Sequence, residues 1–574
     1  MENHSIIDKL NAEQRAVCLE EGNILLTACA GSGKTRTITH RLAYLQNKYP
    51  NSQKYNIAIT YTNRAADEIY SRLDNMGIDT SAIWTGTIHQ FCINFIIRPY
   101  SMYSERLCKG YSIIDEFTVN KYCHNIANNL GITLKAYDNP FTHYEIRSAY
   151  NDLLLKNKEL DFDLILECSL ELLKKNPFIS ENISSIIRTI HVDEYQDTNE
   201  LQYSILSEIY KSQNKICLLF IGDVNQAIYG NLGGVAKSKK ELESIFETSF
   251  KQMHLRGCYR STQQIIDFYK DFEVNPTGIV SVSKIKDEYS EISYNKSISQ
   301  YNLPNEIARI IRKELSNGVP QNEICVLAPQ WRYIFNLTNI LKNLLPDISF
   351  DAPEISPFKY DPLNPFYILA RLVFSEAGKN INIRKKLAKE FLEIIKNDYN
   401  IEISNRYDFL DLLKNANSKD ITEKNGISVY EKAVEHIFRS MKVSLSDNEK
   451  LLQTYKLFIE KSNNRMAKND LSSDYDDICS FFKEKQGVVI STIHGVKGEE
   501  YNTVIGFGLL NGVIPHWDYI LKSDLKPIRE SETKKLLYVL MSRAKQNLFL
   551  FSENDRITKN GSPLSPTDEL SKIQ

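Results

Sequence analysis

The sequence predicts an α/β protein with two parallel-sheet domains, each interrupted by a helical insertion. Its 574 residues exceed the roughly 250–300 residues at which a single hydrophobic core stops growing. Short apolar runs alternate with helical patterns in both halves of the chain, and this alternation is typical of parallel βαβ units. Two further stretches show helical periodicity without a series of strands, which predicts the insertions.

Apolar runs that end in a turn or helix signal predict the strands. In the first half they are Ile24–Ala28, Tyr55–Thr60, Thr189–Val192 and Ile216–Ile221. In the second half they are Ile324–Leu327, Val488–Thr492, Val504–Phe507 and Asn547–Phe551. Parallel sheets of this kind bind nucleotides in the crevice beyond the carboxyl ends of their strands. We therefore expect a nucleotide site at such an edge.

Composition limits the class of protein and its partners. A formal net charge of −2 predicts that any polyanion site is a local groove. The ten cysteines include no CxxC pair and no regular metal spacing, so we expect no zinc site. The first residues are acidic and polar, and no apolar run approaches the ~20 residues that span a bilayer. We therefore expect a cytoplasmic protein without membrane contact.

A glycine-containing loop between the first predicted strand and a helical run is a candidate phosphate site. Its residues are Ala28, Cys29, Ala30, Gly31, Ser32, Gly33, Lys34 and Thr35. Glycines let backbone N–H groups turn toward phosphate, and the helix N-terminus adds positive potential. Lys34 would then reach the β- and γ-phosphates of ATP, and the Thr35 hydroxyl would bind Mg²⁺. Because Ala28 replaces the first glycine of the strict pattern, a simple glycine-rich turn is the alternative.

Two adjacent carboxylates follow the third predicted strand of the first half. Asp193 and Glu194 would repel each other at a strand tip, which is costly unless they are used. Asp193 is placed to hold Mg²⁺, and Glu194 to orient or deprotonate an attacking water. A solvated Asp-Glu pair is the alternative, but the position downstream of the phosphate loop favours the catalytic interpretation.

The phosphate loop and the carboxylate pair resemble motifs of superfamily 1 helicases of the UvrD/Rep/PcrA type, and other segments continue the match in order. These segments are residues 10–14 (LNAEQ), 60–66 (TYTNRAA), 86–89 (GTIH), 192–199 (VDEYQDTN), 222–230 (GDVNQAIYG), 259–261 (YRS), 492–500 (TIHGVKGEE) and 538–544 (YVLMSRA). The resemblance implies two RecA-like motor domains with helical insertions. We place the first motor domain at 1–92 and 158–274, its insertion at 93–157, the second motor domain at 275–374 and 481–574, and a reduced insertion at 375–480.

The resemblance also implies roles for side chains around ATP. Gln14 would hydrogen-bond the adenine base, Tyr259 would stack on it, and Glu500 would lie near the ribose. Arg260 and Arg543 would reach the γ-phosphate, with Arg543 as the arginine finger. Two arginines that arrive from across a cleft neutralise transition-state charge only when the domains close.

A second group of residues would contact a nucleic-acid strand. Gln226 would link the γ-phosphate state to the strand. The contact residues implied by the resemblance are Tyr61, Thr62, Asn63, His89, Thr492 and His494. Tyr61 is the best candidate for stacking on a base, although an aromatic core residue at a strand end is the alternative.

Three departures from the family pattern bear on unwinding. Asn231 and Leu232 stand where the family has an aromatic residue and an arginine, so one stacking platform and one cationic contact are lost. Glu499 replaces a common leucine. The chain is also shorter than typical members, chiefly in the insertions.

Two functional interpretations follow. The first is a translocase or helicase that uses ATP and Mg²⁺ on single-stranded or tailed duplex DNA, with 3′-to-5′ polarity implied by the resemblance. The second is a DNA-sensing regulatory ATPase subunit of a nuclease-containing repair or anti-phage complex, since the chain also resembles the helicase half of Gabija-type systems. It has no compact nuclease signature of its own, so a partner would supply that activity. A non-catalytic scaffold is disfavoured because Lys34, Asp193, Glu194, Arg260 and Arg543 are all present.

Overall fold

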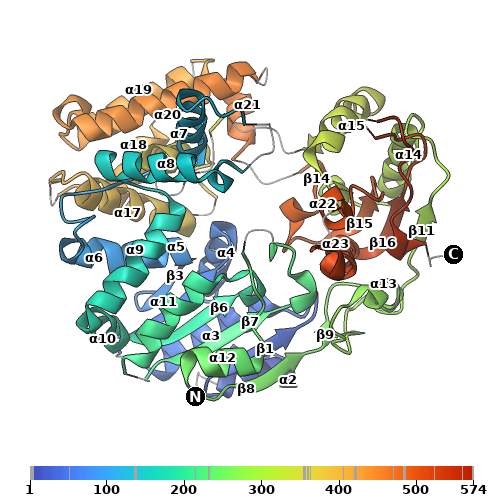
Figure 1. The fold of residues 1–574 in the computed structure, drawn as a ribbon, viewed down its shortest axis with the longest axis horizontal. Helices are drawn as coiled ribbons and strands as arrows, with labels where there is room; N and C mark the ends of the chain where they lie inside the picture. The colour runs from blue at the N-terminus through green and yellow to red at the C-terminus, as the bar shows by residue number, and fades with distance from the viewer. Residues whose placement is uncertain are drawn as a thin grey trace.

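The computed structural model contains two six-stranded sheets in which every pair of neighbouring strands is parallel (Figure 1). The α/β fold class predicted from the sequence is confirmed. The structure describes residues 6–571 except for 51, 115, 135–138, 214, 231–232, 353–356, 359–360, 362–363, 380, 405, 419–422, 469–470, 483–485, 522–523 and 559.

The first sheet has the strand order β3-β2-β6-β7-β1-β8. Its strands are β1 (Ile24–Ala28), β2 (Tyr55–Thr60), β3 (Ile83–Thr87), β6 (Ile187–Asp193), β7 (Cys217–Gly222) and β8 (Lys251–Leu255). Successive residues of β1 pack on opposite faces, because Ile24 and Leu26 join one hydrophobic cluster and Leu25 another. One face is covered by α2 (Ala12–Leu19), α3 (Lys34–Lys48) and α4 (Asn63–Asn75), and the other by α9 (Phe162–Lys175), α10 (Pro177–Ile186) and α11 (Glu200–Lys211).

The second sheet has the strand order β11-β16-β15-β12-β14-β13. Its strands are β11 (Ile292–Asn295), β12 (Ile324–Ala328), β13 (Phe350–Asp351), β14 (Val488–Thr492), β15 (Tyr501–Gly506) and β16 (Ala544–Phe551). One face packs on α14 (Leu303–Ser316) and α15 (Trp331–Leu344), and the other on α13 (Gln263–Tyr269) and α23 (Arg529–Met541).

The first insertion is small. Its helices α7 (Glu116–Asn129) and α8 (Tyr144–Asn157) enclose a separate hydrophobic cluster. A short parallel pair, β4 (Ser112–Ile113) and β5 (Glu159–Leu160), closes its base.

A larger set of helices, here called the helical body, spans residues 365–480. It consists of α16 (Pro365–Phe374), α17 (Ile381–Asp398), α18 (Phe409–Asn417), α19 (Gly426–Ser440), α20 (Glu449–Lys468) and α21 (Tyr475–Ser480). These helices share one hydrophobic cluster that includes nearly all of α16. Helical packing therefore starts at Pro365, ten residues before the position expected from sequence, while the domain limits themselves stay a prediction.

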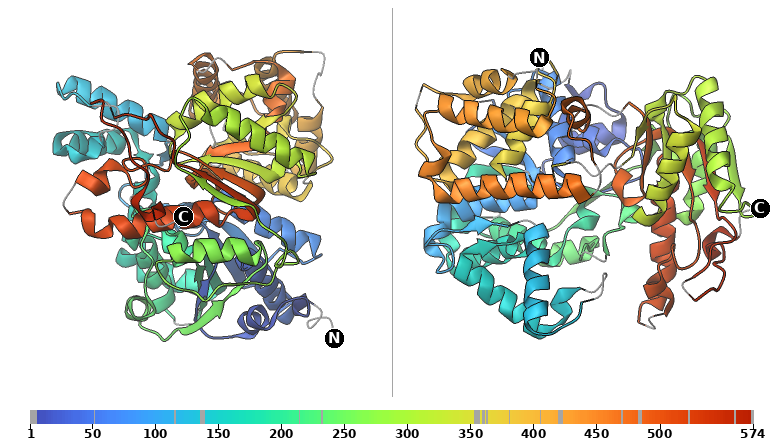
Figure 2. Two further views of the ribbon diagram at one scale, coloured as in Figure 1. Left: turned by 90° about the vertical axis from the view of Figure 1, so that its right-hand side faces the viewer. Right: turned by 90° about the horizontal axis from the view of Figure 1, so that it is seen from above.

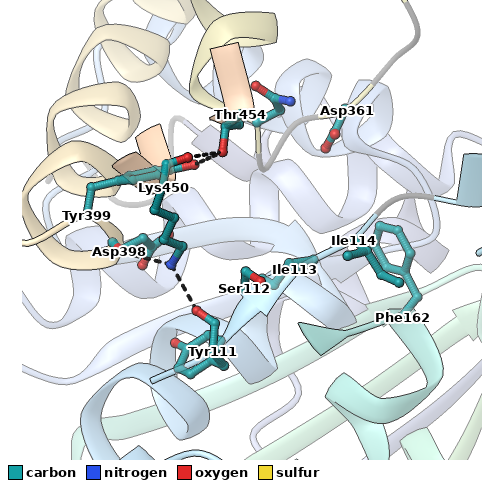
Figure 3. A pocket seen from close by; sticks show the side chains of 11 residues that line it. Tyr111, Ser112, Ile113, Ile114, Phe162, Asp361, Asp398, Tyr399, Lys450 and Thr454 are labelled. Atoms are coloured by element: carbon teal, nitrogen blue, oxygen red, sulfur yellow. Dashed lines mark hydrogen bonds between the residues drawn. The ribbon is translucent and has the colours of Figure 1, made fainter. Parts of the chain in front are cut away.

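The helical body lies beside the first sheet, although its ends connect to strands of the second (Figures 1 and 2). Figure 3 shows part of this junction, where Lys450 Nζ donates to the carbonyl oxygens of Tyr111 (2.9 Å) and Asp398 (3.1 Å). Arg98 forms two hydrogen bonds of 2.8 Å with the Asp398 carboxylate. Among the described residues, no helix is both long and apolar enough to cross a membrane.

Candidate active site and nucleic-acid interface

The phosphate loop is shaped by its two glycines. It joins β1 to α3 (Lys34–Lys48), and its residues 28–30 are buried. Gly31 and Gly33 have φ angles of 69° and 79°, in the left-handed region that strains residues with a Cβ atom. A Cβ at Gly33 would also lie 2.9 Å from Gln14 Nε2. The loop therefore requires glycine at both positions.

The carboxylate pair lies next to the lysine of this loop. Asp193 ends β6, and Glu194 follows with a left-handed φ of 52°, a strained conformation that often marks functional sites. Glu194 Oε1 is 3.6 Å from Lys34 Nζ, and its second oxygen accepts a hydrogen bond from Gln196. Burial and the charge of Glu194 raise the pKa of Asp193. Burial acts in the same direction on Glu194, but Lys34 and Lys497 outweigh it and lower its pKa.

Two arginines border this group: Arg543 comes from the last part of the chain, and Arg260 from a backbone position beside Gly31 of the phosphate loop. Arg543 Nη2 donates to Gln226 Oε1 (3.0 Å), which joins the last part of the chain to the first. Arg260 Nε donates to Glu500 Oε2 (2.8 Å), and its Nη1 donates to the Ser542 carbonyl oxygen (2.6 Å). Burial, with a further contribution from the charge of Arg260, lowers the pKa of Arg543 to about 10. Hydrogen bonds within the chain thus hold both side chains at the cleft.

A cleft of about 790 Å³ brings these groups together, a volume within the usual range for small-molecule sites. The predicted site residues that line it are Gly31, Ser32, Gly33, Lys34, Thr35, Glu194, Gln226, Tyr259, Arg260, Glu500 and Arg543. Three cationic side chains of this set thus face one cavity together with two carboxylates, those of Glu194 and Glu500, which suits a polyphosphate and the chemistry at its terminal group.

Of the two residues expected to contact adenine, Tyr259 is exposed at the cleft and Gln14 is buried. Tyr259 is 40% exposed at the cleft, where its backbone N–H donates to Gly31 O (2.9 Å) and its hydroxyl accepts from Asn11 Nδ2 (2.7 Å). Its ring is therefore free to stack. Gln14 is buried, and its Nε2 donates to Ser32 O (3.1 Å). In this structure Gln14 supports the phosphate loop, and its contact with a base stays a prediction.

A line of three rings crosses between the two sheets. Tyr61 stacks on Tyr229 with ring centroids 4.8 Å apart and an interplanar angle of 25°. Tyr229 in turn lies 5.7 Å from the His494 ring and donates its hydroxyl to the His494 carbonyl oxygen (3.3 Å). Tyr61 is 39% exposed, so it is not an ordinary core aromatic. Sequence reasoning assigned no role to Tyr229, although it is the aromatic residue of the 222–230 segment.

The other residues expected to contact a strand lie near this line, and their side chains contact neighbouring residues of the protein. Thr62 caps α4 (Asn63–Asn75), with its hydroxyl accepting from Ala65 N (3.2 Å). His89 packs edge-on against Phe162 at 5.2 Å, and burial lowers its pKa to about 4, which keeps it neutral. Asn63 and His89 line a second cavity of about 640 Å³, together with Tyr61, Asp193 and Glu194.

The structure does not test what the sequence predicts for three further residues. Thr492 is only 4% exposed, and its hydroxyl accepts from Gly495 N (3.1 Å). Asn231 and Leu232 lie outside the described residues. The role of Thr492 in holding a strand, and the loss of strand contacts at Asn231 and Leu232, both stay predictions.

Comparison with known families decides the class of protein. Residues 10–143 and 135–247 match the family model of the UvrD/REP helicase N-terminal domain, and residues 367–555 match that of the UvrD-like helicase C-terminal domain. The chain belongs to the UvrD/REP helicases. As such it is an ATP-hydrolysing enzyme. It is 23% identical over 636 aligned residues to the ATP-dependent DNA helicase PcrA of Staphylococcus epidermidis and to that of Staphylococcus aureus; each alignment covers 96% of this chain and 84% of the relative.

In this UvrD/REP helicase, Lys497 connects the aromatic line to the cleft, a role that the sequence did not suggest. Its Nζ forms a buried ion pair with Asp197 and donates to the Gln226 carbonyl oxygen (2.7 Å). The same Nζ lies 4.9 Å from the centre of the Tyr229 ring, within cation–π range. Burial raises the pKa of Asp197 to about 6, against the opposing effect of Lys497. The signal available in sequence was an unassigned lysine in the 492–500 segment.

Glu499, the residue that departs from the family pattern, also spans the cleft. It forms an ion pair with Arg64 of α4 and accepts a hydrogen bond from the Tyr501 hydroxyl. The leucine expected there could make neither contact. This helicase therefore has an ionic link between its two halves at the mouth of the cleft.

Proposed function

We propose that this chain is an ATP-driven motor that moves along single-stranded DNA with 3′-to-5′ polarity. The supporting observation is that the cleft and the aromatic line share the boundary between the two sheets. Arg543 and Gln226 meet across it at the cleft, and Tyr229 and His494 meet across it at the line. A change in the separation of the halves on ATP binding or release would therefore move the groups that hold the strand.

We infer that the strand is DNA, and that movement is 3′-to-5′, from similarity to known helicases. The relatives from both Staphylococcus species are DNA helicases by name, and the polarity comes from the resemblance to UvrD/Rep motors. Exposed rings with nearby cations suit any unpaired strand, because every base offers a face for stacking.

The residues of the cleft would have different roles in ATP hydrolysis. Lys34, Arg260 and Arg543 would bind the phosphates and offset charge that develops on the transferred group. Glu194, ionised because Lys34 and Lys497 lower its pKa, would orient the attacking water and accept its proton.

A divalent cation here would be held by few protein groups. Thr35 lines the cleft, Asp193 ends β6, and burial raises the pKa of Asp193 and of Asp223, the latter to about 6. Among the described residues no group of three or more His, Cys, Asp or Glu side chains is arranged to hold a metal ion, so such a cation would also need the nucleotide phosphates as ligands. Thr35 and Asp193 would hold Mg²⁺, which supplies Lewis-acid stabilisation of the phosphates when bound.

Two assays test the proposal. Steady-state ATP hydrolysis should rise strongly on addition of oligo(dT), and Lys34→Ala should abolish it while leaving the thermal unfolding profile unchanged. Strand displacement with 3′-tailed and 5′-tailed duplexes should favour the 3′-tailed substrate. Hydrolysis that ignores DNA, or displacement that prefers the 5′ tail, would contradict the motor and its polarity respectively.

The alternative is a DNA-sensing ATPase subunit of a nuclease-containing defence or repair complex. It is favoured by Asn231 and Leu232, which offer neither a ring nor a guanidinium where the family has both. In that case DNA-stimulated hydrolysis would persist, but the isolated chain would displace strands poorly. Addition of a nuclease encoded beside it would then change the cleavage of DNA in an ATP-dependent manner.

A further inference from the structure

An exposed aromatic pair stands at the start of α15, at the edge of the second sheet. Trp331 and Phe335 are 46% and 49% exposed, and their ring centroids lie 6.3 Å apart. They are four residues apart on a helix, so both rings belong to one face. Two large apolar side chains exposed side by side on a helical first turn indicate a binding surface.

The strand register places this pair at the same edge as the expected strand contacts. In the second sheet, Ala328 at the end of β12 is paired with Thr492 at the end of β14, and Ile493 N donates to Ala328 O (3.1 Å). Trp331 follows Ala328 by three residues, as His494 follows Thr492 by two. Figure 1 shows α15 beside β14 at one end of the second sheet. The pair therefore follows the strand that neighbours the one leading to His494, at the same edge of the second sheet.

The charges around the pair suit a phosphate backbone. Arg332 is exposed, and among the residues that the structure describes no carboxylate forms an ion pair with it. Its guanidinium lies 4.9 Å from the Tyr333 ring centre and donates to the Tyr333 hydroxyl (3.2 Å), which holds it against Tyr333 in the first turn of α15. No side chain caps the first turn of α15, so the positive end of the helix adds to the same field.

We propose that Trp331, Arg332 and Phe335 form a second stacking platform for single-stranded DNA, on the second motor domain. Trp331 and Phe335 stack on unpaired bases, and Arg332 contacts the adjoining phosphate. The platform offers a ring and a guanidinium, the same two groups that Asn231 and Leu232 fail to supply on the first motor domain. This inference rests on the proposed function, since it names a further subsite of the same strand path.

Equilibrium binding to fluorescein-labelled oligo(dT) tests the platform directly. The double variant W331A/F335A should bind about 5- to 100-fold more weakly than the wild type, since each stacked base contributes roughly that much. Trp331→Phe keeps a ring and should restore most of the affinity. Arg332→Gln should weaken binding and reduce the salt dependence by about one phosphate contact. Tyr289→Ala is the matched control: it is 76% exposed and precedes β11, at the opposite edge of the same sheet.

Tryptophan fluorescence gives a second readout that a merely structural role would not change. The chain has three tryptophans, so the oligo(dT)-dependent quenching lost in Trp331→Phe reports stacking at this residue. Blunt duplex DNA of equal length should show little sensitivity to W331A/F335A, because its bases are already stacked. Equal oligo(dT) affinity in W331A/F335A and wild type, with quenching unchanged in Trp331→Phe, would overturn the platform alone. A wild type that neither binds oligo(dT) nor responds to it in ATP hydrolysis would instead overturn the proposed function.

Discussion

Glu194 is the residue in which backbone geometry and electrostatics agree most closely on a catalytic role. It has a left-handed φ of 52° directly after β6, and two lysines lower its pKa. A carboxylate that is ionised, partly buried and beside the phosphate-loop lysine can accept a proton from water without first losing one.

Glu194→Gln should therefore bind ATP and oligo(dT) as the wild type does but hydrolyse ATP about 10²–10⁴-fold more slowly. Glutamine keeps the shape and the hydrogen bond with Gln196 while removing the base. Nucleotide binding is measured with a fluorescent ATP analogue and turnover by phosphate release. A variant that loses ATP affinity yet keeps high residual turnover would show that Glu194 does not act on the water.

Asp197 makes the link between strand and cleft dependent on pH. Its pKa of about 6 lies above the usual value for aspartate, so the carboxylate is ionised at pH 7.5 and becomes protonated as the pH falls through 6. Protonation leaves Lys497 without its anionic partner beside Tyr229. Because the folded-state pKa of Asp197 is raised, its protonation stabilises the folded protein as the pH falls. A weaker link between strand and cleft at low pH would therefore not be caused by unfolding through Asp197.

We expect the stimulation of ATP hydrolysis by oligo(dT) to decrease severalfold between pH 7.5 and pH 5.5. In Asp197→Asn the stimulation should be low at every pH and its profile flat over this window. The measurement is the ratio of turnover with and without saturating oligo(dT), which cancels effects on hydrolysis alone. A wild-type ratio that is independent of pH, or an Asp197→Asn profile that still falls, would remove Asp197 from the coupling.

At the scale of elements, the strands predicted from sequence are those inside the two sheets. The runs that became β1, β2 and β14 have the predicted limits, because nearly every side chain in them is buried. The four edge strands β3, β8, β11 and β13 were not predicted: β8 has polar residues that face solvent, and β13 has only two residues. The phosphate loop and carboxylates were predicted from local chemistry and the family resemblance. The contacts of Tyr229 and Lys497 could not be, because they depend on how the two halves meet.

The helix α4 makes a contact that the sequence could not predict, because the helical body docks on it. Asp67 receives Lys386 Nζ at 3.2 Å on one oxygen and Arg371 Nη2 at 3.4 Å on the other. All three side chains are at most 23% exposed, so the loss of the carboxylate would leave two partly buried cations with less compensation. Since α4 begins next to Tyr61, docking of the helical body also steadies the start of the aromatic line.

Asp67→Ala should weaken this docking by about 1–2 kcal/mol, between the values for exposed and buried pairs. Amide hydrogen exchange should become faster in α4 and α17, without a change in the central strands of the first sheet. Glu435→Ala is the control, since its pair with Arg439 within α19 is 70% and 74% exposed. Unchanged exchange in α4 and α17 would mean that other contacts, such as Arg98 with Asp398, hold the helical body alone.

At the scale of the whole molecule, polar pairs join the two halves across the cleft. Arg543 with Gln226, Lys497 with Asp197, and Arg64 with Glu499 all cross this boundary. The first two pairs are buried, whereas Arg64 is 74% exposed at its side chain. The Arg64 pair is therefore the one whose strength should respond most to salt, and it involves the residue that departs from the family pattern.

Glu499→Leu should raise the KM for ATP about 2- to 5-fold and leave kcat at or above the wild-type value. An ion pair with one largely exposed partner contributes at most about 1 kcal/mol, and this pair joins the two halves that border the cleft. Arg64→Ala should have the same effect, the double variant should be no worse than either single one, and the difference should shrink at high salt. Arg72→Ala is the matched control, because Arg72 lines the same cleft but pairs with Glu68 inside α4. Fully additive effects of Glu499→Leu and Arg64→Ala would mean that the two residues act independently and that the pair does not hold the halves together.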